Sequence, residues 1–354
     1  MAAGDFSASV WPEVQVKALE MWENPRLKQK VARPVESAKG FLENQQVQFD
    51  PVLSGQECIG VKATWLKDCD FDVVEDSNTA WDCTISGAEA ESDSEIYSQN
   101  INYYKTFRVS DGDCDNQFTY ADKVAEQFEK NKSAMDQALN SKILASLVAT
   151  ADASTHTEAI GQTEGTVREI LAADFESKGA DILGDFRLHA QLNQMQNPYF
   201  ITGTNFFVGN YHAQFEALND DQRDRLAKYG AFANWYFDPL AFSNESISTN
   251  SFMIDPGAAG LWHQTDNQSD EPIMMNDKDG MMTWKVDSSQ LFYPDGSPVQ
   301  YEVHAIHTCS RANNNLRKVT DFRLVFKGGF VASPNDCSNH SGIVNFNKVT
   351  SYTS

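Results

Sequence analysis

A long amphipathic stretch between residues 115 and 151 constrains the fold more than any other feature of the sequence. It contains neither Pro nor Gly, and its apolar side chains recur mostly at every fourth position. That spacing is the period of one face of an α-helix. A helix of about 30 residues is on the order of 45 Å long, well beyond the usual globular helix. The pattern predicts a spine helix with a core face made of Val124, Phe128, Met135, Leu139, Ile143 and Leu147.

The start and the solvent side of this spine helix are also indicated by the sequence. Thr119 followed by Asp122 is a capping-box-like start, in which each side chain satisfies a backbone N–H of the other residue. Glu126 and Lys130 are four residues apart, which favours an ion pair on a helix surface. We expect Asp122, Glu126, Glu129 and Lys130 to face away from the core.

Residues 1–50 have the pattern of an N-terminal arm. Trp11 and Pro12 begin a short amphipathic helix, since Pro is tolerated in the first helical turn. The following segment, 24–43, is polar and basic. Because it has too few apolar residues for a core of its own, we expect it to lie on another surface.

Residues 51–110 have the pattern of β structure. Apolar and polar residues alternate around Val61 and again around Phe107, and a period of two is the signature of a strand. The stretches 75–79 and 88–95 between them are acidic and poor in apolar residues, which is typical of an exposed loop tip. The segment predicts β-strands that run outward and return, with little core of their own, directly before the spine helix.

Helical and strand patterns both occur in the part of the chain after the spine helix, and the chain as a whole is expected to have an α+β fold. We expect a linker at 151–165 and a buried strand at 199–208. Helices are expected at 166–179, 181–194 and 211–229.

The last third of the chain reads as strands and turns. Short strands are expected from 232 to 288, with a turn at 255–257 that contains Pro and Gly. Asp295-Gly296 is a hairpin turn signal. Alternating strands are expected around 299–305 and 322–326.

Composition and charge exclude several classes of protein. With 41% hydrophobic residues among 354, a sizeable core is available and global disorder is excluded. The formal net charge of −22 repels nucleic acid and anionic membranes. We see no signal peptide and no apolar run that would span a membrane, so synthesis in the cytoplasm is expected. The six cysteines form no CxxC pair, so we expect free thiols without a zinc site.

No residue pattern points firmly to catalysis or metal binding. His304 and His307 are three apart on an expected strand, so their side chains would lie on opposite faces. The acidic residues of 111–122 resemble part of a calcium loop, but Asn116 stands where that loop needs Gly. Motifs such as GxSxG, HExxH and the P-loop are absent from the sequence. We therefore expect no enzyme, no cofactor and no metal.

The order of elements resembles the major capsid protein of tailed bacteriophages, the Hong Kong 97-like fold. Three stretches carry the resemblance. Residues 6–14, FSASVWPEV, look like the opening of the arm in that family. Residues 103–111 and 125–139 look like its return strand and spine helix, and 206–211, FFVGNY, like the strand that opens its axial domain.

This resemblance implies a division of the chain into five parts. They are an N-terminal arm at 1–50, an extended β loop at 51–112, a peripheral domain with the spine helix at 113–195, an axial domain at 196–290, and closing strands at 291–354.

It also implies a function and partners. The chain would assemble into hexamers and pentamers of an icosahedral head in the host bacterial cytoplasm and become part of the virion. That head would enclose double-stranded DNA without sequence-specific binding and would meet portal, scaffolding and decoration proteins. Since Met1 stands only a few residues before the arm opening, we expect a separate scaffolding protein or the basic arm itself to guide assembly. The arm residues expected to take part in assembly are Trp11, Arg26, Lys28, Lys30 and Arg33.

Three alternatives remain open at this point. An encapsulin-type nanocompartment shell would have the same fold and an enzyme cargo. An acidic α/β enzyme would need titratable residues clustered in a concave site. A β-rich adhesion module would be expected to carry a signal sequence.

Overall fold

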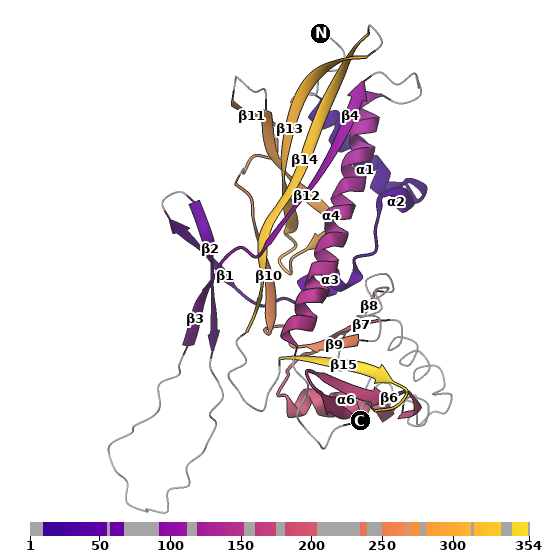
Figure 1. Ribbon diagram of the computed structural model, residues 1–354, viewed down its shortest axis with the longest axis vertical. Helices are drawn as coiled ribbons and strands as arrows, with labels where there is room; N and C mark the ends of the chain where they lie inside the picture. The colour runs from indigo at the N-terminus through magenta and orange to yellow at the C-terminus, as the bar shows by residue number, and fades with distance from the viewer. Residues whose placement is uncertain are drawn as a thin grey trace, which may run out of the picture.

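The computed structural model describes residues 10–54, 57–66, 92–111, 119–151, 160–174, 181–203, 234–238, 250–266, 268–276, 281–312, 315–333 and 342–352. Within these ranges, helices pack against two six-stranded sheets, and a separate three-stranded sheet lies to one side (Figure 1). The α+β class expected from the sequence is confirmed.

The helix α4, Tyr120–Thr150, has 31 residues and runs along the central sheet (Figure 1). The side chain of Thr119 accepts a hydrogen bond from the backbone N–H of Asp122, and the Asp122 carboxylate accepts one from the backbone N–H of Thr119. The predicted capping box is therefore confirmed. The six apolar residues expected on its core face are all buried.

The central sheet is antiparallel and lies against α4. Its strands are β4 (Ile101–Asp111), β10 (Ala259–Gln264), β11 (Ile273–Asn276), β12 (Met281–Phe292), β13 (Pro298–Ala312) and β14 (Asn315–Ala332). β14 pairs with β13 and β10 along one edge and with β4 along the other. The turn between β12 and β13 contains Gly296 at a φ of 81°, a conformation that favours glycine, which confirms the predicted hairpin turn.

The main core lies between this sheet and α4, and Phe128 is at its centre. The ring of Phe128 is 5.2 to 5.3 Å, centroid to centroid, from the rings of Trp11, Phe107 and Phe322. Edge-to-face contacts at this distance stabilise beyond the burial of area alone. The alternation expected near the C-terminus is confirmed, since the buried side chains there include Val299, Tyr301, Val303, Ala305, Phe322, Leu324 and Phe326.

The N-terminal segment forms three helices, α1 (Trp11–Glu23), α2 (Pro25–Val31) and α3 (Glu36–Glu43), which pack along α4. Pro12 lies in the first turn of α1, as expected. Val35, Phe41 and Leu42 are fully buried in the same core as α4. The segment therefore has no core of its own, and the surface on which it lies belongs to the same chain.

A second six-stranded sheet lies below the end of α4 (Figure 1). Its order is β5 (Gln162–Glu164), β6 (Val167–Leu171), β15 (Ile343–Val349), β9 (Asn250–Ile254), β7 (Tyr199–Thr202) and β8 (Asn234–Phe237). The helix α6, Asp181–Leu192, packs Phe186 against Phe200 and Phe346 of this sheet. The predicted helix at 181–194 and the start of the predicted strand at 199–208 are confirmed.

The predicted helix at 166–179 is wrong in its first part, where residues 167–171 form β6. Gly165, at a φ of 56°, closes a hairpin between β5 and β6. β6 then pairs in parallel with β15, far along the chain. Ladder bonds to a distant strand override a local helical pattern. The helix expected at 211–229 lies outside the described residues.

The strands β1 (Phe49–Ser54), β2 (Glu57–Leu66) and β3 (Ser92–Tyr97) form the three-stranded sheet, here called the β projection (Figure 1). At its base, Val61 and Ala63 pack against Trp262 and Val331 of the body. The return strand β4, also within the predicted β loop, instead joins the central sheet.

Each of the two larger sheets combines strands from the ranges expected for different domains. β10, β11 and β12, from the range expected for an axial domain, are strands of the central sheet. β5 and β6, from the range expected for a peripheral domain, are strands of the lower sheet. The division into peripheral and axial domains stays a prediction.

Candidate functional site

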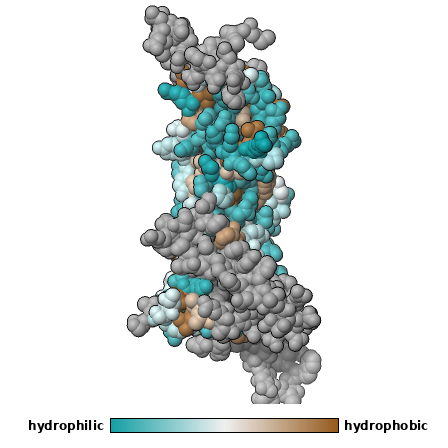
Figure 2. All heavy atoms as spheres, turned by 90° about the vertical axis from the view of Figure 1, so that its right-hand side faces the viewer, coloured by the Kyte–Doolittle hydropathy of each residue, from teal (hydrophilic) through white to brown (hydrophobic). Residues whose placement is uncertain are grey.

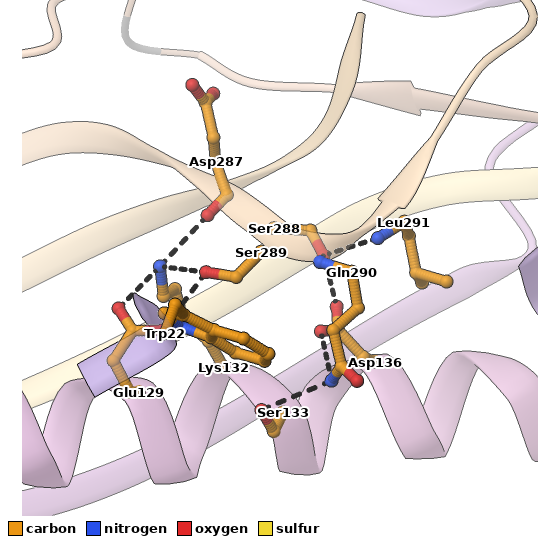
Figure 3. Close-up of polar contacts among 10 residues, drawn as sticks. All are labelled: Trp22, Glu129, Lys132, Ser133, Asp136, Asp287, Ser288, Ser289, Gln290 and Leu291. Carbon is orange, nitrogen blue, oxygen red and sulfur yellow. Dashed lines mark hydrogen bonds and ion pairs between the residues drawn. The ribbon is translucent and has the colours of Figure 1, made fainter. Parts of the chain in front are cut away.

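A bulge in β12 turns three successive polar residues toward α4. The pairing of β12 with β13 shifts register between Asp287 and Phe292. Within the bulge, Ser288 Oγ accepts hydrogen bonds from the backbone N–H groups of Gln290 and Leu291, at 3.1 and 3.0 Å. The side chains of Ser288, Ser289 and Gln290 then meet polar residues of α4 (Figure 3).

One half of this cluster is an ion pair between Glu129 and Lys132, with their charged atoms 2.7 Å apart. Glu129 also accepts from Trp22 Nε1 at 2.6 Å and from Ser289 Oγ at 3.0 Å. Lys132 donates to the backbone oxygen of Asp287 at 3.1 Å and to Ser289 Oγ at 3.0 Å (Figure 3). A buried ion pair is tolerated when its remaining donors and acceptors are satisfied, as they are here.

The expectation that Glu129 faces solvent is wrong, because its exposed fraction is only 2%. Helical position alone placed it on the polar side. The side chain is buried because α1 covers that side of α4 and brings Trp22 over it.

The other half of the cluster surrounds Asp136. Its Oδ1 accepts from Ser288 Oγ at 2.8 Å and from the hydroxyl of Tyr301, and its Oδ2 accepts from Gln290 Nε2 at 3.4 Å. Burial raises the pKa of Asp136 to about 6, against the opposing effect of these hydrogen bonds and of Lys132. Burial, with the nearby Asp136, also raises the pKa of Tyr301. These acceptors are occupied by the chain's own donors, so the cluster fits a junction between helix and sheet.

A second junction fixes α3. The backbone N–H of Ala38 donates to Asn140 Oδ1 of α4 at 2.6 Å, and Asn140 Nδ2 donates to the Asp238 carboxylate, next to β8, at 2.7 Å. The N–H of Ser37 also reaches Asp238, at 3.4 Å. The arm, α4 and the lower sheet are thereby joined at one point.

Of the arm residues expected to act in assembly, Trp11 lies apart from the others. Its side chain is buried, stacks edge-on against Phe128 and Trp284, and donates from Nε1 to the backbone oxygen of Asp270 at 3.2 Å. These contacts hold Trp11 against the body of its own chain. The side chains of Arg26, Lys28, Lys30 and Arg33 are all exposed.

Figure 2 looks onto the side that carries α1 and α2, where hydrophilic residues dominate the visible body with a few apolar ones among them. On α1, Val16 and Leu19 are 56% and 63% exposed. A cleft of about 660 Å³ between α1 and β12 lies over Glu129 and Lys132. The outer side of the arm thus presents apolar groups that the described part of the chain leaves uncovered.

The β projection presents open edges. Its order β1–β2–β3 leaves one edge of β1 and one edge of β3 without a strand partner in the described ranges. Ile96 on β3 is 59% exposed. Unpaired edge strands are templates for pairing with another chain.

The described residues bear on two expectations from the sequence, that the chain has no metal site and no membrane span. These contain no group of three or more His, Cys, Asp or Glu side chains placed to hold a metal. His304 contacts Glu302 at 2.9 Å, whereas His307 contacts Thr320 at 3.2 Å. The calcium-like stretch lies largely outside the described ranges. None of the helices in those ranges combines the length and hydrophobicity that crossing a membrane requires.

Comparisons with known proteins gave structural neighbours only. No protein-family model matches the sequence, and no curated protein matches it. A chain from a structure of Mycobacterium phage Che8 is 11% identical with a TM-score of 0.42, over 85% of this chain and 92% of that chain. A chain from the mature capsid of bacteriophage PhiM1 is 8% identical with a TM-score of 0.42, over 83% of each chain.

A third neighbour comes from the capsid of a native GTA particle. It is 9% identical with a TM-score of 0.39, over 90% of this chain and 91% of that chain. Solved capsids are therefore among the structures to which this chain is similar, at TM-scores too low to support a function by themselves.

Proposed function

We propose that this chain is a shell-forming structural protein, the major capsid protein of a tailed phage. Its copies would form hexamers and pentamers of an icosahedral head that encloses double-stranded DNA. The observation that carries the proposal is the β projection, a sheet with open edges that is held to the body at its base. Such a sheet is stable in an assembly where neighbouring copies cover its edges.

The rest of the body suits a rigid building block. The arm, α4 and the two larger sheets are joined through one aromatic core and two buried polar junctions. Fully satisfied polar networks fix a single arrangement of the elements that they connect. When the contact surfaces of a rigid body point in fixed directions, its copies form closed rings more readily than open assemblies of varying size.

The charge of the chain supports a container for DNA. At a formal net charge of −22, its surface repels phosphate, so a packed genome would be enclosed without sequence-specific binding. Portal, scaffolding and decoration proteins belong to the same proposal as partners of the shell.

The test is the state of the purified full-length chain at increasing concentration, alone and with a co-expressed scaffolding protein. Sedimentation velocity and negative-stain electron microscopy should show capsomers and closed particles. A single species at the monomer mass of 39.5 kDa under all these conditions contradicts the proposal.

The contents of such particles separate the phage shell from the encapsulin alternative. Particles from infected or reconstituted systems that hold double-stranded DNA and a portal support the phage head. Particles that enclose a specific enzyme support the nanocompartment instead.

A further inference from the structure

The segment around α2 differs in charge from the rest of the chain. Arg26, Lys28, Lys30 and Arg33 lie within eight residues, and positions 24–35 contain no acidic residue. All four side chains are exposed, and none has an ion pair among the residues that the structure describes. Other described cations, such as Lys17, Lys39 and Lys130, are paired with carboxylates. In a chain with a net charge of −22, such an unneutralised cluster marks a surface for an acidic partner.

The helix α2 holds Arg26, Lys28 and Lys30 in place, and Arg33 follows two residues after its last residue, Val31. Its first turn is capped by Asn24, with Pro25 in the first turn, and Val31 is buried at its other end. Lys28 Nζ lies 5.6 Å from the centre of the Trp22 ring, a cation–π distance. Since α2 packs on α4, the backbone that carries these side chains needs little ordering on binding.

The stretch of the sequence with the most acidic residues has the opposite charge. Residues 68–95 contain no Lys, Arg or His, and their ten acidic residues are Asp68, Asp70, Asp72, Glu75, Asp76, Asp82, Glu89, Glu91, Asp93 and Glu95. This segment follows β2 and includes the first residues of β3 of the β projection. The β projection and α2 lie on opposite sides of the body (Figure 1). A partner for α2 is therefore more readily supplied by a neighbouring copy.

We infer that the basic surface formed by Arg26, Lys28, Lys30 and Arg33 binds the acidic segment 68–95 of a second copy of this chain. The inference rests on the proposed function, since it gives that assembly a specific contact. Nucleic acid is the other polyanion that such a surface would attract, but the net charge of the whole chain disfavours its approach.

Charge reversal on α2 tests the contact. The variant Arg26→Glu/Lys30→Glu should lower the fraction of chain in particles at least about tenfold at low salt, a change of about 1.4 kcal/mol in association. The matched control Lys105→Glu/Lys123→Glu has the same change in net charge and should assemble like the unmodified chain. Circular dichroism and the thermal midpoint of each unassembled variant should be unchanged, because the α2 side chains are exposed.

Charge exchange identifies the partner. Adding Glu89→Lys/Glu91→Lys to the α2 variant should restore particle formation, whereas Glu89→Lys/Glu91→Lys alone should impair it. Particles of the unmodified chain should also lose stability as salt rises from about 0.1 M to 1 M, since the screening length falls from about 10 Å to about 3 Å.

Three results would overturn the inference. One is normal assembly of the α2 variant. Another is an equal defect in the α2 variant and in its Lys105→Glu/Lys123→Glu control. The third is a failure of the exchanged charges to restore particles, which would assign α2 to a different partner such as DNA. Absence of particles from the unmodified chain would instead count against the proposed function.

Discussion

At the scale of single residues, the buried pair of Glu129 and Lys132 makes the sharpest energetic prediction. Glu129→Ala would leave the ammonium of Lys132 buried without its carboxylate, so we expect a loss of about 3–5 kcal/mol in the free energy of unfolding. This loss is comparable with the loss of about 2–5 kcal/mol expected for Leu139→Ala. The control Glu126→Ala removes a half-exposed partner of Lys130 and should cost at most about 0.5 kcal/mol. Urea denaturation measures all three, and a cost for Glu129→Ala as small as the control would show that the pair is not buried.

Asp136 predicts a pH dependence of stability. Its pKa is about 6 in the folded chain and about 3.9 when unfolded. Because the folded pKa is raised, the contribution of this group is present in full below about pH 4 and is lost as the pH rises through about 6.

Asp136→Asn should remove this dependence. Relative to the variant, the unmodified chain should lose about 2–3 kcal/mol of unfolding free energy between about pH 4 and pH 7. The exposed Asp50→Asn serves as the control. Unfolding free energies of the unmodified and Asp136→Asn chains that stay parallel across this pH range would contradict the assignment.

At the scale of elements, the arm depends on a close approach between α3 and β8. A Cβ atom at Gly40 would lie 2.3 Å from the ring of Tyr236, so only glycine fits there. Gly40→Ala should cost about 1–3 kcal/mol through overpacking. A Cβ atom added at Gly184 in α6 would meet no neighbouring group of the described residues within 4 Å, and Gly184→Ala should stabilise by about 0.5–1 kcal/mol through helix propensity.

Thermal unfolding of the two alanine variants measures this contrast. Combining Gly40→Ala with Tyr236→Ala should show a coupling, because the second change vacates the volume that the first one needs. Equal effects at Gly40 and Gly184 would mean that α3 does not pack against β8 as described.

At the scale of the whole molecule, the β projection should be separable from the body. Pro51 and Tyr97 both pair with Val61, on its two sides, so they lie about 10 Å apart. A linker of about six Gly and Ser residues can therefore replace the residues between them. The shortened chain should keep its helical circular dichroism and cooperative unfolding but form no particles. If this variant formed particles of normal size, the β projection would not be needed for assembly, which contradicts the prediction.

Features that depend on short-range interactions can be predicted from the amino-acid sequence alone. The position of α4, its capping box at Thr119 and its buried apolar face follow from spacing within a few turns. The hairpin turn at Gly296 follows from the need for a positive φ at one residue.

Features that depend on partners far away in the chain become visible only in the folded structure. Residues 167–171 are a strand because β15 pairs with them, and no local pattern encodes that pairing. Glu129 is buried because α1 places Trp22 over it and the β12 bulge places Ser289 beside it. Helical periodicity reports which side of a helix is polar, but whether that side meets water depends on which other elements cover it.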